Sequence, residues 1–528
     1  MERELIICAV VLILCILSSK TSGKIGIPAL LIFIFIGMMF GSDGIMKIPF
    51  DNYLLAENVC TIALVIIMFY GGFSTKWTAA KPVAVRACII SSAGVVITAL
   101  LTGLFSFFVL RIDLKESILL GAVISSTDAA SVFSILRSKN LNLKGGLAPL
   151  LEVESGSNDP FSYMLTFAAL VILKGQEVGF VAGMIVLQLI FGVLFGVLFG
   201  YFSPIIMKKL NLLSGSFDSI FLSAIVLLSY AIPSVLGGNG YLSVYIAGII
   251  MGNSKIKNTP SLVHFFNGIT GMAQIIVFSI LGLLSFPSRL PSILVTALLV
   301  FLFLTFVARP VAVFILMIKG YDIKEKMFVS WAGLRGASSI VFAIMATVSD
   351  APVEIDIFHI IFCVSLLSVS VQGTLLPFVA KKLNLIDNNY NVLKTFNDYA
   401  EEKDVAIMKV HIAEGHGWEN KKISEVNMPD DSLALMIKRG DGTIIPKGNT
   451  IIMAGDDVIL NVPIYSVEND ITLKEITVHK GHEWENKKIG ELKLSDNTLI
   501  TLIKRKNEAI IPDGNTVIKK DDIMVIYQ

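Results

Sequence analysis

Three polar clusters interrupt long apolar stretches of this sequence, and each carries charged side chains. They read SSTDAAS around Asp128, EVESGSNDP with Glu152, Glu154 and Asp159, and WAGLRGASS around Arg335. A charge inside a bilayer is costly, and residues of this kind mark ion or proton pathways when apolar stretches cross a membrane. The first question is therefore what these carboxylates bind.

Asp159 has the neighbours that an exchanging carboxylate requires. Ser155 lies one helical turn earlier on the same face, Asn158 is adjacent, and Pro160 removes one backbone hydrogen bond. Carboxylate, hydroxyl and freed carbonyl oxygens suit a hard monovalent cation such as Na+ or K+, and a buried carboxylate can hold a proton instead. One site that takes either ligand, but not both, is the minimum device for exchange.

The other two clusters indicate interruptions in membrane helices. Residues 125–128 compete with the backbone for hydrogen bonds, and broken helices expose N–H and C=O ends where transporter sites form. Thr127 offers oxygen ligands, and Asp128 is either a ligand or a compensator of a positive helix end. Arg335 stands between two glycines and is expected to neutralise Glu154 or a negative helix end.

Composition supports a membrane protein. The chain has 528 residues, of which 54% are hydrophobic and 16% are charged, whereas soluble domains are about one quarter charged. The net charge of +1 gives no reason to expect a nucleic-acid partner. At roughly 20 apolar residues per spanning helix, about 13 candidates follow, at 4–19, 27–41, 56–72, 83–110, 116–136, 147–173, 180–207, 216–235, 240–252, 263–286, 290–318, 327–348 and 355–380.

Loop charges predict the orientation of these spans. One alternate set of loops holds most of the lysines and arginines, among them Lys76, Lys81, Lys208, Lys324 and Lys381. Cytosolic loops carry such an excess. We therefore expect a multi-pass protein of the cytoplasmic (inner) membrane with its N-terminus outside and its C-terminal tail in the cytosol.

The tail is an internal repeat. GHGWENKKISE at 415–425 recurs as GHEWENKKIGE at 481–491, and IKRGDGTIIPKGNT at 437–450 recurs as IKRKNEAIIPDGNT at 503–516. Alternating apolar residues between Gly-Asn and Asp-Gly turns predict strands. The predicted organisation is an all-α polytopic membrane domain at 1–385, a linker at 386–402, and a cytosolic α+β tail of two small β-rich modules at 403–465 and 466–528.

The STDAA, ESGSNDP and GLRGA motifs, in this order over residues 1–385, resemble the bacterial monovalent cation:proton antiporters of the first cation:proton antiporter family. The resemblance implies inverted repeats, crossed broken helices around the ion, a homodimer, and a core domain that moves like an elevator against a dimerisation domain. It also implies no cofactor and no enzymatic activity, because the ligands are the transported K+ (or Na+) and H+.

The same resemblance assigns roles to individual residues. Thr127, Ser155 and Asp159 would bind the ion, and Asp128 would compensate helix ends. Asn158 stands where electrogenic relatives have a second Asp, which implies electroneutral exchange of one cation per proton.

Two further points follow from this family likeness. Glu154 and Arg335 would form a structural ion pair. Related proteins often carry an acid before the Gly-Gly of the third span, whereas this chain has Tyr70 there, so ion selectivity does not carry over.

The tail modules resemble the C-terminal ligand-binding module of regulators of potassium conductance (TrkA-C). Such modules usually dimerise and bind a small regulator, which in several potassium proteins is a cyclic dinucleotide. This likeness favours K+ as the transported ion. The tail lacks the glycine-rich fingerprint of a dinucleotide-binding Rossmann unit, so the sequence gives no support for NAD binding.

The leading interpretation is a regulated K+/H+ antiporter important for pH homeostasis, and the same-class alternative is a Na+/H+ antiporter. A regulated potassium channel is a distant alternative, because a channel would need a carbonyl-lined filter such as TVGYG, which the sequence lacks. A membrane enzyme is disfavoured because the spans hold no Ser/His/Asp or metal constellation.

Overall fold

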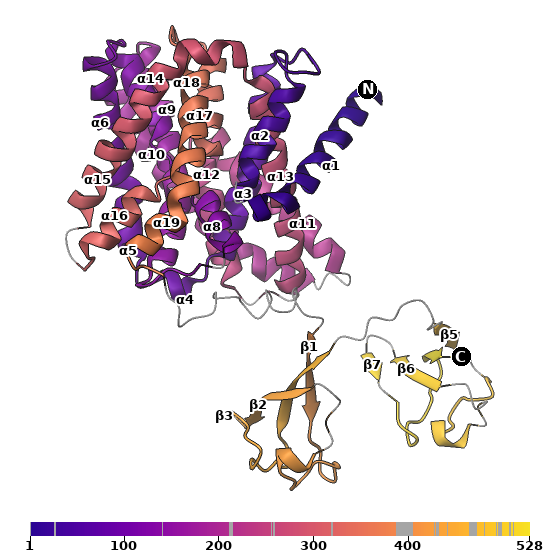
Figure 1. The fold of residues 1–528 in the computed structure, drawn as a ribbon. Coiled ribbons are helices and arrows are strands. Elements are labelled where there is room, and N and C mark those ends of the chain that lie inside the picture. The colour runs from indigo at the N-terminus through magenta and orange to yellow at the C-terminus, as the bar shows by residue number, and fades with distance from the viewer. Residues whose placement is uncertain are drawn as a thin grey trace. The chain divides into compact units, whose positions relative to one another are not determined.

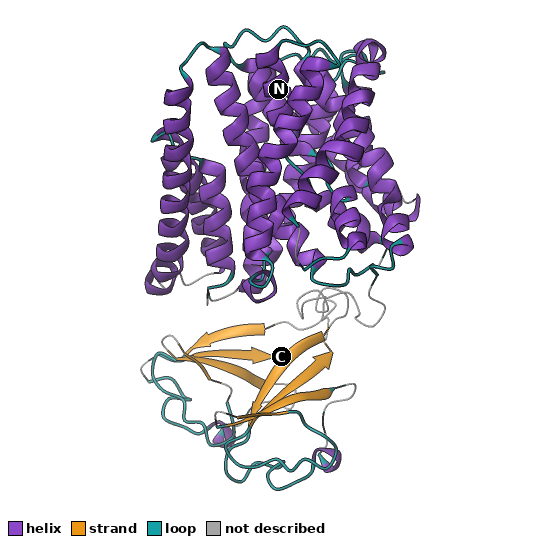
Figure 2. Cartoon of the chain, turned by 90° about the vertical axis from the view of Figure 1, so that its left-hand side faces the viewer, coloured by secondary structure: helices purple, strands orange, loops and turns teal. Residues whose placement is uncertain are grey.

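The structure is a computed structural model with two compact units, Met1–Leu393 and Lys394–Gln528. Helices fill the first unit and strands the second (Figures 1 and 2). The residues that it describes are 2–25, 28–139, 141–210, 215–254, 256, 259–317, 320–386, 405–426, 428, 432–440, 442–463, 473–479, 481–492, 494, 499–505, 508–510 and 512–527. The predicted linker 386–402 lies outside them from residue 387 onward.

By their mutual contacts, the helices of the first unit form two bundles, with most contacts made within a bundle. The first bundle, here called the α3/α12 bundle, contains α1 (Glu2–Ile25), α2 (Ala29–Phe40), α3 (Tyr53–Ser74), α10 (Val178–Leu210), α11 (Gly215–Val235), α12 (Gly240–Gly252) and α13 (Thr259–Leu284). The short α4 (Trp77–Ala80) follows α3.

The second bundle, here called the α9 bundle, carries all three polar clusters. Its N-terminal part contains α5 (Ala84–Ile89), the π-helical turn η1 (Ile90–Gly94), α6 (Val95–Phe108), α7 (Leu114–Ile124), α8 (Ala129–Ser138) and α9 (Leu147–Leu173). Its C-terminal part contains η2 (Pro287–Arg289), α14 (Leu290–Phe303), η3 (Leu304–Ala308), α15 (Arg309–Leu316), α16 (Ile323–Trp331), α17 (Ala337–Val348), α18 (Ile357–Leu367), η4 (Ser368–Gly373) and α19 (Thr374–Lys382).

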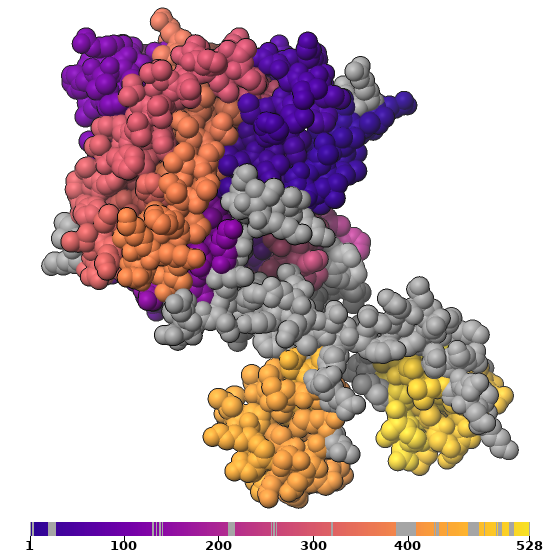
Figure 3. All heavy atoms as spheres, viewed as in Figure 1, coloured from indigo at the N-terminus to yellow at the C-terminus, as the bar shows by residue number. Residues whose placement is uncertain are grey.

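The two bundles meet along α3, α9, α12 and α17. In the space-filling view the indigo N-terminal helices border the orange helices that end this unit (Figure 3). The site helix α9 therefore lies at a boundary between two separately packed groups of helices.

Every predicted span contains at least one helix. Among the described residues, seven helices are long and apolar enough to cross a membrane by length and composition. Other predicted spans are short, such as α12, or broken, as between α7 and α8 and between α16 and α17. The span at α9 is one helix of 27 residues, but it carries the second polar cluster and is not among the seven. The predicted fold class, a polytopic helical domain followed by β-rich modules, is confirmed.

Glycines bring α10 and α12 into close contact. Gly192, Gly196 and Gly200 stand four residues apart, and a Cβ on Gly196 would come within 2.9 Å of the Ser243 carbonyl oxygen of α12. A Cβ on Gly200 would come within 2.8 Å of Ile250. Small residues at this spacing let helix backbones approach closely, and this stripe packs inside the chain.

The second unit contains two four-stranded antiparallel sheets of the same topology, β1-β4-β2-β3 and β5-β8-β6-β7. The first has β1 (Val405–His411), β2 (Leu433–Arg439), β3 (Gly442–Ile444) and β4 (Asp457–Pro463), with the single turn η5 (Ile423–Glu425). The second has β5 (Leu473–Thr477), β6 (Leu499–Arg505), β7 (Glu508–Ile510) and β8 (Ile523–Tyr527), with η6 (Ile489–Glu491). The sequence repeat is thus a structural repeat.

Each module has the same internal ion pair. Arg439 donates from Nε and Nη2 to the Asp456 carboxylate, both at 2.8 Å, and Arg505 does the same to Asp522 at 2.8 and 2.7 Å. The side chains of Asp456 and Asp522 are fully buried. The Arg439 hydrogen bond holds the pKa of Asp456 below its usual range despite the opposing effect of burial.

We expect Asp456→Asn to destabilise the first module by about 2 kcal/mol at pH 7, because Arg439 loses a charge-assisted partner. A lowered folded-state pKa gives stability that is present above the unfolded pKa of about 3.9 and is lost as pH falls through the folded value. The variant should lose this acid dependence. Hydrogen exchange of β2 and β4 amides in the full chain measures both effects, and the unaltered second module is the internal control.

Candidate functional site

The two broken helices touch at their interruptions. α7 ends at Ile124 and α8 begins at Ala129, while α16 ends at Trp331 and α17 begins at Ala337. The backbone N–H of Asp128 donates to the Leu334 carbonyl at 2.8 Å. A Cβ on Gly336 would come within 2.1 Å of the Asp128 carboxylate. Glycine is therefore needed at 336 for the breaks to meet.

Charged side chains satisfy the helix ends at this crossing. Asp128 Oδ1 accepts the backbone N–H of Ser131 at 3.1 Å, and Oδ2 accepts the Ser131 hydroxyl at 2.6 Å, which makes Asp128 the N-cap of α8. Arg335 Nη1 donates to the Ser126 carbonyl at 2.6 Å, just beyond the end of α7. A negative charge stabilises the N-terminus of a helix and a positive charge its C-terminus, so Asp128 suits the start of α8 and Arg335 suits the end of α7.

The Asp159 carboxylate lies beside this crossing. Its Oδ1 accepts a hydrogen bond from the Ser126 hydroxyl, and the Ser126 and Ser338 hydroxyl oxygens are 2.8 Å apart. Ser126 is fully buried, whereas Asp159 is only partly buried. One carboxylate and two hydroxyls, from α9 and from both broken helices, therefore face each other.

A second layer of contacts ties α9 to the first break. The Ser155 hydroxyl donates to the Thr127 carbonyl at 2.8 Å. The Asn158 side-chain amide donates to the Thr127 hydroxyl, and it lies 3.4 Å from Glu154 Oε1. These four side chains are buried. Asn158 and Ser155 thus fix the backbone of the break against the helix that carries Asp159.

The buried ion pair has a different partner from the one expected. Arg309 Nη2 donates to both Glu154 oxygens at 3.0 Å, and both side chains are almost fully buried. The predicted pairing of Glu154 with Arg335 is wrong, because Arg309 is the partner of Glu154. Arg335 instead donates to the free carbonyl of Ser126, just beyond the end of α7, which agrees with the alternative expectation that it neutralises a negative helix end. Arg309 directly follows the π-helical turn η3, and its position before Pro310 in an apolar span was the available sequence signal.

The structure thus brings together the predicted site residues of the first two clusters, and it adds Ser126, Ser338 and Arg309. The predicted residues are Thr127, Asp128, Glu154, Ser155, Asn158 and Asp159. Ser126 and Ser338 were visible in the sequence only as members of serine-rich motifs, and Arg309 only as an isolated charge. Tyr70 lies partly buried on α3. Glu152, two turns before Asp159 on α9, accepts a hydrogen bond from Thr75 at 3.1 Å.

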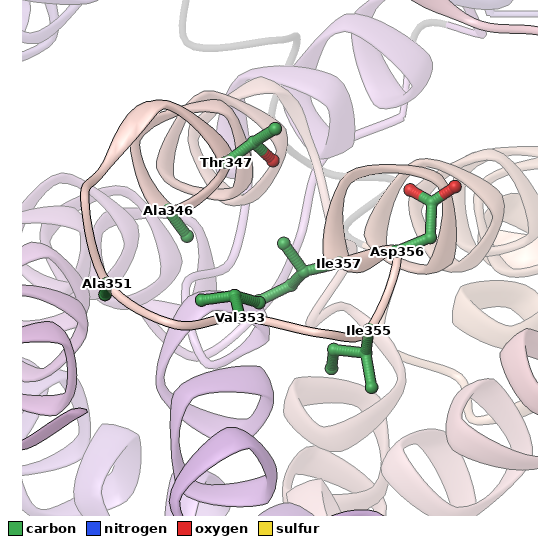
Figure 4. A pocket seen from close by; sticks show the side chains of 7 residues that line it. All are labelled: Ala346, Thr347, Ala351, Val353, Ile355, Asp356 and Ile357. Atoms are coloured by element: carbon green, nitrogen blue, oxygen red, sulfur yellow. The ribbon is translucent and has the colours of Figure 1, made fainter.

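A small cavity of about 110 Å3 lies elsewhere, where α17 ends and α18 begins (Figure 4). Its lining includes none of the residues of the three polar clusters. The residues are Ala346, Thr347, Ala351, Val353, Ile355, Asp356 and Ile357.

Two broken helices that meet beside a carboxylate, within a polytopic helical bundle, are the arrangement of secondary membrane transporters. The sequence model of the family described as "Sodium/hydrogen exchanger, transmembrane" matches residues 9–382. The TrkA-C domain matches 407–463 and 473–527. The chain belongs to the sodium/hydrogen exchanger family, whose members are secondary transporters and not enzymes, so the predicted family and tail modules are confirmed.

Named relatives agree with this placement. The chain is 31% identical over 449 residues to the K(+)/H(+) antiporter NhaP2 of Shewanella sp. (strain ANA-3), covering 84% of this chain and 78% of the relative. It is 34% identical over 384 residues to the K(+)/H(+) antiporter NhaP of Alkalimonas amylolytica, covering 72% of this chain and 67% of the relative. Cation:proton antiport across a membrane is therefore its activity.

The fold also matches a solved structure. The sodium proton antiporter MjNhaP1 from Methanocaldococcus jannaschii superposes with a TM-score of 0.64 at 24% identity, covering 72% of this chain and 99% of that one. This likeness concerns the helical unit and supports the fold assignment.

Proposed function

We propose that this protein exchanges K+ for H+ by alternating access, with the Asp159 carboxylate binding either ion. The observation that carries the proposal is the position of Asp159, a partly buried carboxylate that faces hydroxyls from both broken helices. A monovalent cation and a proton each neutralise this negative charge, so they compete for the same oxygens. Inward and outward exposure of the one carboxylate then couples the two fluxes.

The proposed ion site includes Thr127, Ser155 and Asp128 beside Asp159. Thr127 and Ser155 supply oxygens within the second layer, while Asp128, as the N-cap of α8, balances the helix end. Asn158 is neutral and already donates to Thr127. With Asp159 as the exchanging acid, one cation would move per proton, which gives electroneutral exchange.

K+ is preferred over Na+ on two grounds. Relatives at 31% and 34% identity are named K(+)/H(+) antiporters, and the tail carries two TrkA-C modules. The alternative is Na+/H+ exchange by the same mechanism, since oxygen ligands of this kind suit both ions. Purified protein in liposomes, with a pH-sensitive dye and added K+, Na+ or Li+ across pH, decides between them. A proton flux that responds to Na+ and not to K+ contradicts the proposal.

We also propose that the tail faces the cytosol, that the protein works as a homodimer in the inner membrane, and that the tail binds a small regulator such as a cyclic dinucleotide. Orientation rests on the excess of basic residues in one set of loops. The regulator rests on the TrkA-C match. Calorimetric titration of the full chain with cyclic dinucleotides tests the ligand, and protease access to the tail in sealed vesicles tests the orientation.

A short segment after α19, residues 385–386 and here called the strap, is held against the loop between α8 and α9. The segment after α19 pairs with the loop between α8 and α9, through a bridge of Leu143 to Ile386 and a 2.9 Å hydrogen bond from Lys144 N to the Leu385 carbonyl. Leu385 also belongs to the apolar cluster that contains Leu136 of α8 and Leu147 of α9. The chain thus leaves the membrane unit against the two helices that carry Asp128 and Asp159.

Removing residues 395–528 should therefore change regulation and leave exchange intact, because the truncated chain keeps the strap and the whole site. The expected result is retained dye response with K+ and an altered dependence on pH or on cyclic dinucleotide. Asp159→Asn in the same truncated chain is the control for background leak. A membrane-inserted truncation without any exchange contradicts this division of roles.

A further inference from the structure

One face of α9 lies on the boundary between the two bundles. Glu152, Gly156, Asp159 and Tyr163 follow at four, seven and eleven residues along this helix, so they share a face. Tyr163 packs edge-on against Tyr241 of α12, with ring centroids 5.0 Å apart. The exchanging carboxylate therefore lies on the surface that α9 presents to the α3/α12 bundle.

Between Asp159 and the N-terminal end of α9, this face makes two different kinds of contact with the α3/α12 bundle. A Cβ on Gly156 would lie within 2.4 Å of the Tyr245 ring, so the ring rests on the bare backbone of α9. Two turns from Asp159, about 10 Å along the axis, Glu152 Oε1 lies 3.1 Å from the Thr75 hydroxyl. This hydroxyl also donates to the Gly71 carbonyl of its own helix α3 at 2.8 Å, so the two acceptors share its one proton. The contact of the Tyr245 ring with Gly156 is not directional, so a small shift of α9 can preserve it. The Thr75–Glu152 hydrogen bond depends on distance and angle, so the same shift weakens it.

The donor of this hydrogen bond is held by the opposite bundle. Thr75 caps the end of α3, and its carbonyl accepts from the Asn253 side chain at the end of α12, at 2.9 Å. Asn253 Oδ1 also accepts the Trp77 backbone N–H at 2.8 Å. Thr75 is 3% exposed. Its hydroxyl is thus a fixed point on the α3/α12 bundle, not a mobile surface group.

We propose that Glu152 is a positioning residue for exchange, and that its hydrogen bond with Thr75 holds α9 in one of the two access states. The inference rests on the proposed alternating access, in which the two bundles move relative to each other. A shift of α9 by a few ångströms breaks the contact, which is then formed in one state and absent in the other. Glu152 thereby sets the balance between the states without binding the ion at Asp159.

A contact made in one state alone has a distinctive kinetic effect. The apparent dissociation constant on each side equals the intrinsic constant divided by the fraction of protein open to that side. Loss of the contact lowers one fraction and raises the other. The ratio of the two KM values should change about fivefold, as expected for one partly hydrated hydrogen bond to a charged group.

Thr75→Val tests this, because it removes the hydroxyl and preserves the shape of the side chain. The hydrogen bond to the Gly71 carbonyl is lost as well, but it lies within α3 and its C-cap, so its loss should affect both access states equally. Thr75→Ser restores the donor and is the matched control. KM for K+ and maximal rate are measured in vesicles of both orientations, with sidedness determined by protease access to the tail. We expect opposite KM changes on the two sides for Thr75→Val, a smaller change for Glu152→Gln, which retains an acceptor oxygen, and wild-type values for Thr75→Ser.

Two outcomes overturn the inference while leaving the proposed function in place. One is unchanged KM on both sides in Thr75→Val. The other is an equal fall in maximal rate on both sides with a constant KM ratio, which is what simple structural damage produces. Failure of the wild-type protein to exchange a monovalent cation for protons would instead reject the proposed function itself.

Discussion

Asp159→Asn should abolish cation:proton exchange and leave the protein folded. The amide has almost the same shape as the carboxylate and can still accept the Ser126 hydrogen bond. It cannot, however, be neutral in one step and negative in the next. The expected result is a proton flux at the level of empty liposomes with K+, Na+ and Li+ at every pH. Size-exclusion profile and thermal unfolding should match the wild-type protein.

The matched control is Asp218→Asn. Asp218 is another aspartate on an apolar helix, 7% exposed, but it lies in the first turn of α11 in the α3/α12 bundle. This variant should keep wild-type KM for the cation. Exchange in Asp159→Asn at a rate close to wild type would show that another group carries the proton. Single-channel currents that persist in that variant would favour the channel alternative.

The features that could be predicted from sequence are those that depend on local pattern. The length of each apolar stretch predicted the positions of the spans. The serine-rich stretch before Asp128 predicted the break between α7 and α8. Alternation and repeat placed the two β modules. In each case neighbouring residues carry enough information, because helix breaks and strand pairing are decided within a short segment.

The sequence pattern could not predict which buried arginine pairs with which buried acid. Glu154 had two buried arginines available, at positions far away in sequence, and charge alone does not distinguish them. Arg335 lies within the second break, and its Nη1 donates to the Ser126 carbonyl in the first break at 2.6 Å. Arg309, the first residue of α15, reaches Glu154 of α9 because α15 and α9 both pack against α16 and η1, which is a property of tertiary packing. The hydroxyl of Ser338 joined the site for the same reason.

Arg309→Met should be the most destabilising substitution in the site. It would leave Glu154, at 2% exposure, without its cationic partner. Removal of one member of a buried pair costs about 3–5 kcal/mol, whereas replacement of both members can be nearly neutral. The double variant Glu154→Gln with Arg309→Met should therefore be more stable than Arg309→Met alone. Thermal unfolding of the four proteins in one detergent gives the coupling energy of the pair.

An exposed pair provides the control for this cycle. Arg289 and Asp356 are 3.8 Å apart with side-chain exposures of 61% and 35%, and such pairs contribute at most about 1 kcal/mol. Arg289→Met should thus change the unfolding temperature little. If Arg309→Met behaves the same way, Glu154 must be neutral or compensated by another group. Because Glu154 also faces Asn158 and Thr127, loss of its partner should disturb the break beside Asp159 and reduce exchange even in the fraction that remains folded.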